Sequence, residues 1–203
     1  MMRLYRVLLF AGLVGVAAQP AGAQHTVYAE ITLARLPESY ADFAAAYRAA
    51  GTQPEDVIAL YIAALHLFTQ DAAAGTQALT QLVDPELLQI DAKAPGGYTL
   101  KRTDLSLLHA QLQRPIVHSY IQGTQPDAGY ALPAPPYTLV ILRSKMTDAK
   151  EGQFLLKSSG TSSPRPILLV QRAAVVCARL ECPAYACALS QRKTPGQNWP
   201  AWV

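Results

Sequence analysis

Apolar residues recur with two different periods, and the change of period divides the chain into a helical part and a β-rich part. In the first part the helical spacing predicts helices over residues 39–50, 52–71, 71–84 and 104–114. Ser39, Thr52 and either Thr103 or Asp104 are the expected N-caps. Gly75 is the expected weak point of the third helix, which the pattern predicts as either continuous or broken.

The helix over 52–71 is predicted to be the most buried element of the chain. Pro54 lies near its first turn, and acidic residues follow at its N-terminal end, where the helix dipole favours them. Its apolar positions form one wide face. That face consists of Val57, Leu60, Tyr61, Ala64, Leu65 and Phe68.

A proline-rich loop separates the helices from the predicted strands. Residues 123–137 contain four prolines and two glycines, a composition that excludes helix and central strand. Three β-forming runs follow the loop and are the predicted strands: Tyr137–Arg143, Gln153–Ser158 and Pro166–Arg172. Helices followed by strands predict an α+β fold, in which N-terminal helices pack on an antiparallel sheet of C-terminal hairpins. This order of helices followed by hairpins is similar to that of cone-shaped α+β domains of the nuclear-transport-factor-2 type.

The stretch "SSGTSSPRP" joins the second and third predicted strands. It has a single glycine and no helix after it, so it lacks the features of a phosphate-binding loop. It also lacks a G-x-S-x-G elbow and a recognisable catalytic triad order. A hairpin turn is therefore the favoured interpretation, with ligand contact and serine catalysis as the alternatives.

The N-terminus resembles a cleaved export signal. Arg3 and Arg6 precede an uncharged apolar run over residues 7–18, and a small-x-small motif ends at Ala23. An apolar run of about a dozen residues is too short to span a bilayer, which needs about 20. The alternatives are a membrane-anchoring helix and a buried N-terminal helix. We predict cleavage after Ala23 and export, periplasmic or secreted, with no transmembrane segment in the mature chain.

The charge balance gives no indication of a nucleic-acid or membrane-surface partner. The full chain has 17 basic and 14 acidic residues. The predicted signal holds two of the basic residues and no acidic one, so the mature chain carries a net charge of only +1. The length of the mature chain fits one domain with a substantial core.

Two stretches, "RPIVHSYIQGTQPDAGYALPAPPYTL" and "FLLKSSGTSSPRPILL", resemble the paired signature of a bacterial family known as domain of unknown function 6935. The resemblance runs from about Leu36 to Arg172 and implies a fold but no activity. Thr161 and Ser162 replace the usual Ala-Asp, so the acid that would pair with Arg165 is missing, and Ile121 replaces an aromatic residue. The matching positions are Ser119, Tyr120, Gly123, Pro126, Pro136, Tyr137, Ser158, Ser159, Gly160, Ser163, Pro164, Arg165 and Pro166.

Residues 173–203 depart from that family pattern, which continues with a tryptophan-bearing strand. All three cysteines, Cys177, Cys182 and Cys187, lie there with a spacing that matches no zinc or redox motif. Read one base later, the codons of Ala-Ala-Val-Val permit Arg-Arg-Trp, as the family pattern requires. We therefore predict a frameshift near Arg172. The alternative is a divergent tail with one disulfide and one free thiol. The predicted organisation is a signal peptide over 1–23, one α+β domain over 24–172 and an atypical tail.

Candidate chemistry is sparse. His118, Tyr120, Tyr130 and Arg165 are the candidates to line a pocket at the open end of the sheet. The favoured alternative is that the aromatic side chains fill the core and Arg165 meets solvent. We predict no catalytic residue, metal site or cofactor. The favoured function is a non-enzymatic domain that binds a small ligand, an envelope component or a protein partner. The alternative is a small-pocket enzyme, a hydrolase or isomerase, that uses His118 and Arg165.

Overall fold

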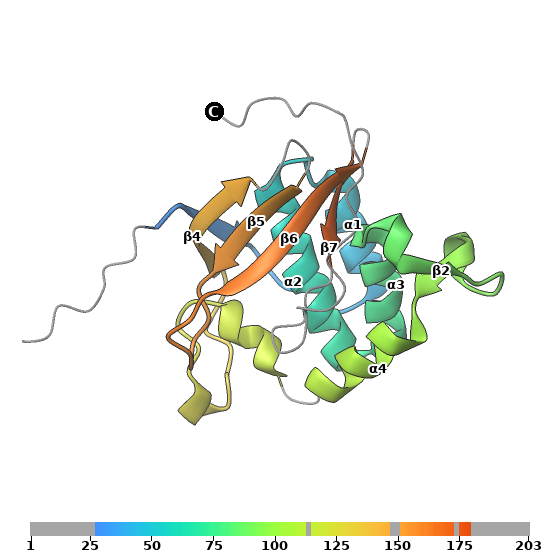
Figure 1. Cartoon of the computed structure of the whole chain (residues 1–203). Coiled ribbons are helices and arrows are strands. Elements are labelled where there is room, and N and C mark those ends of the chain that lie inside the picture. The colour runs from blue at the N-terminus through green and yellow to red at the C-terminus, as the bar shows by residue number, and fades with distance from the viewer. Residues whose placement is uncertain (1–26, 113–114, 147–150, 173–174, 180–203) are drawn as a thin grey trace, which may run out of the picture.

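Helices pack against one face of a five-stranded antiparallel sheet, with strand order β1-β4-β5-β6-β7 (Figure 1). This computed structural model describes residues 27–112, 115–146, 151–172 and 175–179. The predicted α+β class is confirmed. The α-helices are α1 (Tyr40–Ala49), α2 (Pro54–Gln70), α3 (Ala72–Leu82) and α4 (Arg102–Gln111). The strands of the sheet are β1 (Ala29–Leu33), β4 (Tyr137–Met146), β5 (Glu151–Leu156), β6 (Arg165–Arg172) and β7 (Val175–Arg179).

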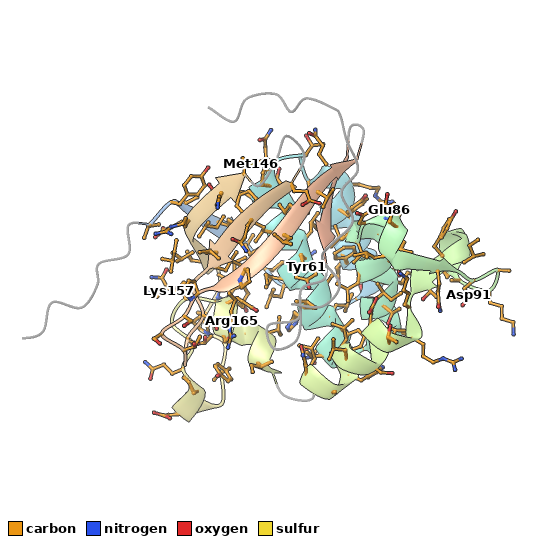
Figure 2. The ribbon with its side chains drawn as sticks, in the orientation of Figure 1. Tyr61, Glu86, Asp91, Met146, Lys157 and Arg165 are labelled. Carbon is orange, nitrogen blue, oxygen red and sulfur yellow. The ribbon has the colours of Figure 1, made fainter. Side chains whose placement is uncertain are left out.

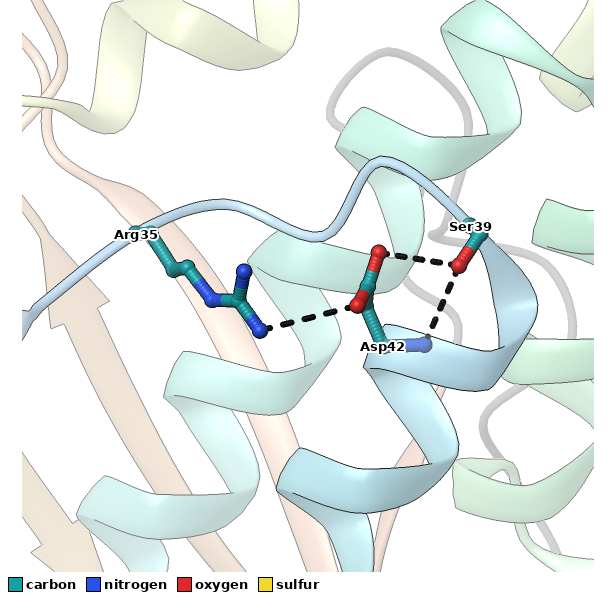
Figure 3. A network of polar contacts seen from close by, with 3 residues as sticks. All are labelled: Arg35, Ser39 and Asp42. Carbon is teal, nitrogen blue, oxygen red and sulfur yellow. Dashed lines mark hydrogen bonds and ion pairs between the residues drawn. The ribbon is translucent and has the colours of Figure 1, made fainter.

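Helix α1 begins at the predicted N-cap. The Ser39 hydroxyl oxygen accepts the backbone N–H of Asp42 at 3.2 Å, and the hydroxyl donates to the Asp42 carboxylate at 2.8 Å (Figure 3). Arg35 lies 3.5 Å from the same carboxylate. The hydrogen bond from Ser39, followed by the charge of Arg35, lowers the pKa of Asp42.

Helix α2 is the centre of the core. The six apolar positions predicted for its buried face are all buried, as are Ile58, Ile62 and Leu67 on its other sides. The helix is buried nearly all round because it contacts α1 and α3 on one side and the strands β1 and β7 on another. The prediction that this helix is the most buried is confirmed by its core residues.

Gly75 is a packing position in α3, and the alternative that the helix is broken there is wrong. Helix α3 is continuous through Gly75. A Cβ atom at this position would lie 2.2 Å from the Cα of Phe68 in α2. The absence of a side chain therefore allows the two helices to approach closely, because any larger residue would meet the backbone of α2.

Two of the predicted caps are wrong. Helix α2 begins after Gln53, whose side chain makes no capping hydrogen bond, and Pro54 occupies its first position, where proline is favoured. Helix α4 begins after Lys101, so Thr103 and Asp104 lie within its first turn. Asp71, which the sequence places between two helices, caps α3 by accepting the N–H groups of Ala73 and Ala74.

The three predicted strands are confirmed as β4, β5 and β6. Sequence patterns did not predict β1, which pairs with β4 from Ala29↔Ile141 to Leu33↔Tyr137. Nor did they predict β7, which lies in the tail segment and pairs with β6 from Leu168↔Arg179 to Arg172↔Val175. The sheet therefore extends beyond Arg172, the predicted end of the domain.

The turn over 158–164 joins β5 to β6 as an antiparallel hairpin, so the favoured interpretation of "SSGTSSPRP" is confirmed. Leu156 pairs with Arg165 at the start of the hairpin. Pro166 pairs with Leu155 on the β5 side, whereas the described pairing with β7 begins only at Leu168. Because Pro166 is near the strand end, its missing N–H removes no described ladder bond to β7.

A second, two-stranded hairpin projects from the body of the molecule (Figure 1). It consists of β2 (Leu88–Ile90) and β3 (Tyr98–Leu100), with Ile90 opposite Tyr98. Leu100 anchors it in the core, whereas Ile90 is 83% exposed. Across the described part of the chain, no helix has both the length and the apolar character needed to cross a membrane.

Candidate functional site

A cavity of about 430 Å³ lies between α2, the end of α4 and the β5–β6 turn. Its apolar wall comes from Tyr61 and Leu65 of α2, from Leu112 and from Ile116. Ile116 belongs to the 3₁₀ helix η3 (Pro115–Tyr120), which packs against α2. The opposite wall comes from the β5–β6 turn and from the first residues of β6. The volume is within the usual range of small-molecule sites.

Hydrogen bonds of backbone and hydroxyl groups join the β5–β6 turn to η3 and to the residues that follow it. The backbone N–H of Ser159 donates to the carbonyl of Ser119 at 2.8 Å, and the Ser158 hydroxyl donates to the Ser119 hydroxyl at 2.9 Å. The Thr124 hydroxyl donates to the His118 and Ile121 carbonyls, both at 2.9 Å, and lies 3.0 Å from the Ser159 hydroxyl. Two segments about 40 residues apart are thus held in a fixed relation by groups that are largely buried.

The two motifs of the resemblance pack directly on each other at Gly160. This glycine has φ +78°, and a Cβ atom here would lie 2.5 Å from Cγ of Pro126 and 3.0 Å from the Tyr130 hydroxyl. Pro126 begins a short 3₁₀ turn (Pro126–Ala128) in the proline-rich loop. Both the left-handed backbone and the close contact require glycine, which gives a physical reason for the residue in this motif.

Arg165 is the one charged side chain among the described residues that line this cavity. It is half-buried at the start of β6, near the turn (Figure 2). Within the described part of the chain its guanidinium makes no ion pair, since the ion pair found there is that of Arg35 with Asp42. The missing acid of the motif therefore leaves Arg165 without a carboxylate partner in this region.

His66 and His118 form a hydrogen-bonded pair next to the cavity wall. The Nδ1 of His66 lies 2.9 Å from the Nε2 of His118, and the Nδ1 of His118 lies 3.2 Å from the Tyr130 carbonyl oxygen. A carbonyl oxygen only accepts hydrogen bonds, so the neutral His118 ring carries its proton on Nδ1. Its Nε2 has no proton and is an acceptor. His66 must then donate from Nδ1. One backbone carbonyl thus fixes the tautomers of both rings.

Both histidines are neutral at pH 7. Burial, followed by the neighbouring His118, lowers the pKa of His66 to about 4. Burial also lowers the pKa of His118, against the opposing effect of the hydrogen bond to Tyr130. Neither ring therefore contributes a positive charge to the cavity wall at neutral pH.

The predicted pocket residues occupy different places. Tyr120, Tyr130 and Arg165 line the cavity. His118 is buried behind that wall, with both ring nitrogens within hydrogen-bonding distance of His66 and Tyr130. No sequence signal connects the two histidines, which are 52 residues apart.

The motif positions divide between the cavity wall and its support. Ser119, Ser159, Gly160 and Pro166 line the cavity, and Pro164 lines a second cavity of about 380 Å³ that also includes Lys157. Three further positions shape the loops: Gly123 has φ +91°, Pro126 contacts Gly160, and the Ser163 N–H donates to Thr161 Oγ1. Thr124, which the motif did not single out, holds the two loops together.

The described residues contain no group of three or more His, Cys, Asp or Glu side chains placed to hold a metal ion. Of the cysteines, Cys177 lies in β7 opposite Val170, and Cys182 and Cys187 lie outside the described residues. Residues 1–23, the predicted signal, also lie outside them.

The fold and the cavity define an α+β domain with an amphipathic pocket between its central helix and a hairpin turn. The family model for a domain of unknown function, DUF6935, matches residues 35–175, which is more than half of the chain. The chain belongs to this family, as the resemblance predicted. No curated protein and no solved structure matches it, so the likeness to domains of the nuclear-transport-factor-2 type stays a prediction.

Proposed function

We propose that this chain is an exported domain that binds a small molecule in the 430 Å³ cavity and does not transform it. The observation that carries the proposal is the amphipathic wall of this cavity, which has Leu65, Leu112 and Ile116 on one side and the turn hydroxyls with Arg165 on the other. Binding sites for small molecules combine such an apolar lining with few polar groups.

The wall is held in place by contacts that do not depend on a ligand. Hydrogen bonds between Ser119 and the β5–β6 turn fix the polar side, and the core packing of α2 fixes the apolar side. A site that is already formed loses little conformational entropy on binding. This supports a receptor that takes up its ligand without a large rearrangement.

Several observations argue against catalysis by the described residues. The hydrogen bonds of the described serine hydroxyls in the turn go to other hydroxyls and to carbonyl oxygens, not to a histidine base. His118 has both ring nitrogens within hydrogen-bonding distance of protein atoms and does not line the cavity. The proposed role is therefore binding. The N-terminus, which resembles a cleaved export signal, supports the proposal that the domain is exported.

The test is a titration of the mature protein with N-phenylnaphthylamine, a neutral dye that fluoresces in apolar surroundings. We expect saturable binding with one dye per chain. Leu65→Trp replaces an aliphatic side chain of the lining with a bulky indole ring and should reduce dye binding at least tenfold. Ile90→Trp on the exposed hairpin should leave dye binding unchanged. Absence of saturable binding to the unsubstituted protein, or equal binding by Leu65→Trp protein of native stability, would overturn the proposal.

A further inference from the structure

From the charge and shape of the cavity we infer that its ligand is an amphipathic carboxylate, with the carboxylate bound by Arg165 and the apolar body against α2 and η3. This inference rests on the proposed function and adds the chemical class of the ligand. It starts from an asymmetry of charge, since the charged group among the described lining residues is a single cation, Arg165.

The backbone of Arg165 is restrained on both sides. Pro164 and Pro166 flank it, and a residue before proline is restricted to extended conformations. Its pairing with Leu156 fixes the register of the strand. A guanidinium on a restrained backbone is a preorganised partner for a carboxylate, which it can bind with two parallel hydrogen bonds.

The residues around Arg165 favour an anion and exclude a cation. No acidic side chain belongs to the described lining of this cavity, so a cationic ligand would meet Arg165 without compensation. The hydroxyls of Ser159 and Thr161 line the same cavity but donate to the carbonyls of Ser119 and Ser163, so the charge of the ligand is recognised by Arg165. Because His66 and His118 are neutral, the preference for an anion depends on Arg165 and is constant through the neutral range.

The remainder of the wall favours an apolar body on the ligand. Leu65, Leu112, Ile116 and Ile167 give an aliphatic surface, and Tyr61 of α2 lies along it (Figure 2). Burying an alkyl chain against this surface removes its methylene groups from water, which favours binding. A short, fully polar anion would forgo this contribution, so a medium-chain carboxylate fits both halves of the wall.

The test compares decanoate with decanol, which has the same chain without the charge, by displacement of N-phenylnaphthylamine at pH 7.5. We expect decanoate to displace the dye at about tenfold lower concentration than decanol. Arg165→Gln should remove this difference, and Arg165→Lys should retain part of it. Lys157→Gln, a charge change at the second cavity, is the matched control and should keep the full preference.

The outcomes separate the inference from the proposed function. Dye binding with equal displacement by decanoate and decanol would leave a ligand-binding domain but overturn the carboxylate assignment. A preference for decanoate that persists in Arg165→Gln would also overturn it, since the charge would be recognised elsewhere. Absence of dye binding would overturn the proposed function itself. Melting temperatures of the Arg165 variants within about 3 °C of the unsubstituted protein establish that the comparison is between folded proteins.

Discussion

His66 donates a hydrogen bond of 2.9 Å from its Nδ1 to the Nε2 of His118, and the Tyr130 carbonyl sets the direction of that bond. The pair connects the central helix to the 3₁₀ segment η3, and η3 contributes Ile116, Ser119 and Tyr120 to the cavity wall. It is therefore a structural support of the proposed binding site, made from two residues whose side chains more often carry catalysis or metals.

The first prediction concerns the pH dependence of stability. The pKa of His66 falls from 6.5 in the unfolded chain to about 4 in the fold. Below pH 6.5 the unfolded chain binds a proton at His66 that the folded protein does not bind. The stability that depends on the neutral His66 ring is therefore complete above pH 6.5 and is lost as the pH falls from 6.5 towards 4. After allowance for its partial exposure, we expect a loss on the order of 1–2 kcal/mol. Urea unfolding at pH 7 and pH 4.5 measures it, and His66→Gln should show a smaller loss.

Nuclear magnetic resonance titration of the histidine rings gives the independent check. His66 should titrate below pH 5, whereas an apparent pKa near 6.5 would show that the ring is solvated and unpaired in solution.

The second prediction concerns the energetic coupling of the two histidines. His118→Ala leaves the Tyr130 carbonyl and the His66 N–H without their partner, which should cost about 1–3 kcal/mol. In a double-mutant cycle with His66→Ala, we expect a coupling energy of about 0.5–1.5 kcal/mol. A cycle of His66→Ala with His109→Ala is the control, because the ring of His109 makes a tilted contact with Phe68 and should couple weakly to His66. Equal coupling in both cycles would contradict a specific bond.

The third prediction separates backbone strain from contact at Gly160. Gly160→Ala must adopt φ +78° and also place its Cβ against the ring of Pro126. Gly97→Ala has nearly the same φ, +77°, with no atom within 4 Å. We expect a loss of about 1–2 kcal/mol for Gly97→Ala, from strain alone, and about 2–4 kcal/mol for Gly160→Ala. Chemical unfolding measures both, and equal losses would exclude the contact.

The fourth prediction is the sign of the effect of Gly75→Ala. In an exposed helix this change stabilises by about 1 kcal/mol. Here the new Cβ would lie 2.2 Å from the Phe68 Cα, so α3 must move away from α2. We expect a net loss of about 2 kcal/mol or more in the free energy of unfolding. Thr76→Ala, the neighbouring half-exposed position, should change it by less than about 0.5 kcal/mol. Stabilisation by Gly75→Ala would mean that the helices are not in this close contact.

The fifth prediction concerns the mature chain and its tail. An intact mass of the protein expressed from its native gene, with the locus resequenced, should correspond to a start at Gln24 and to a shifted reading frame after Arg172. A mass that matches residues 24–203 as written would contradict the frameshift and establish the three-cysteine tail. A mass lower than that by two hydrogens would then indicate a disulfide.

The sequence by itself determined the fold class, the four α-helices and three of the strands. Helical spacing in 52–71 predicted α2 and its six buried positions, and the prolines and short β-forming runs predicted the hairpin at 158–164. These features are local, because the period of apolar positions and the conformational limits of proline act over a few residues. The search for candidate chemistry also grouped His118, Tyr120, Tyr130 and Arg165 as one pocket hypothesis, and the last three line the same cavity.

Only the tertiary structure decided how distant residues meet. The pairing of His66 with His118, the partner of β1 and the contact of Gly75 with Phe68 each depend on which surfaces pack together. An isolated histidine or glycine has no periodicity, so no pattern along the chain distinguishes a packing position from a weak point. Burial creates these roles: it removes water from the histidine pair and excludes the Cβ at Gly75, and burial is a property of the assembled fold.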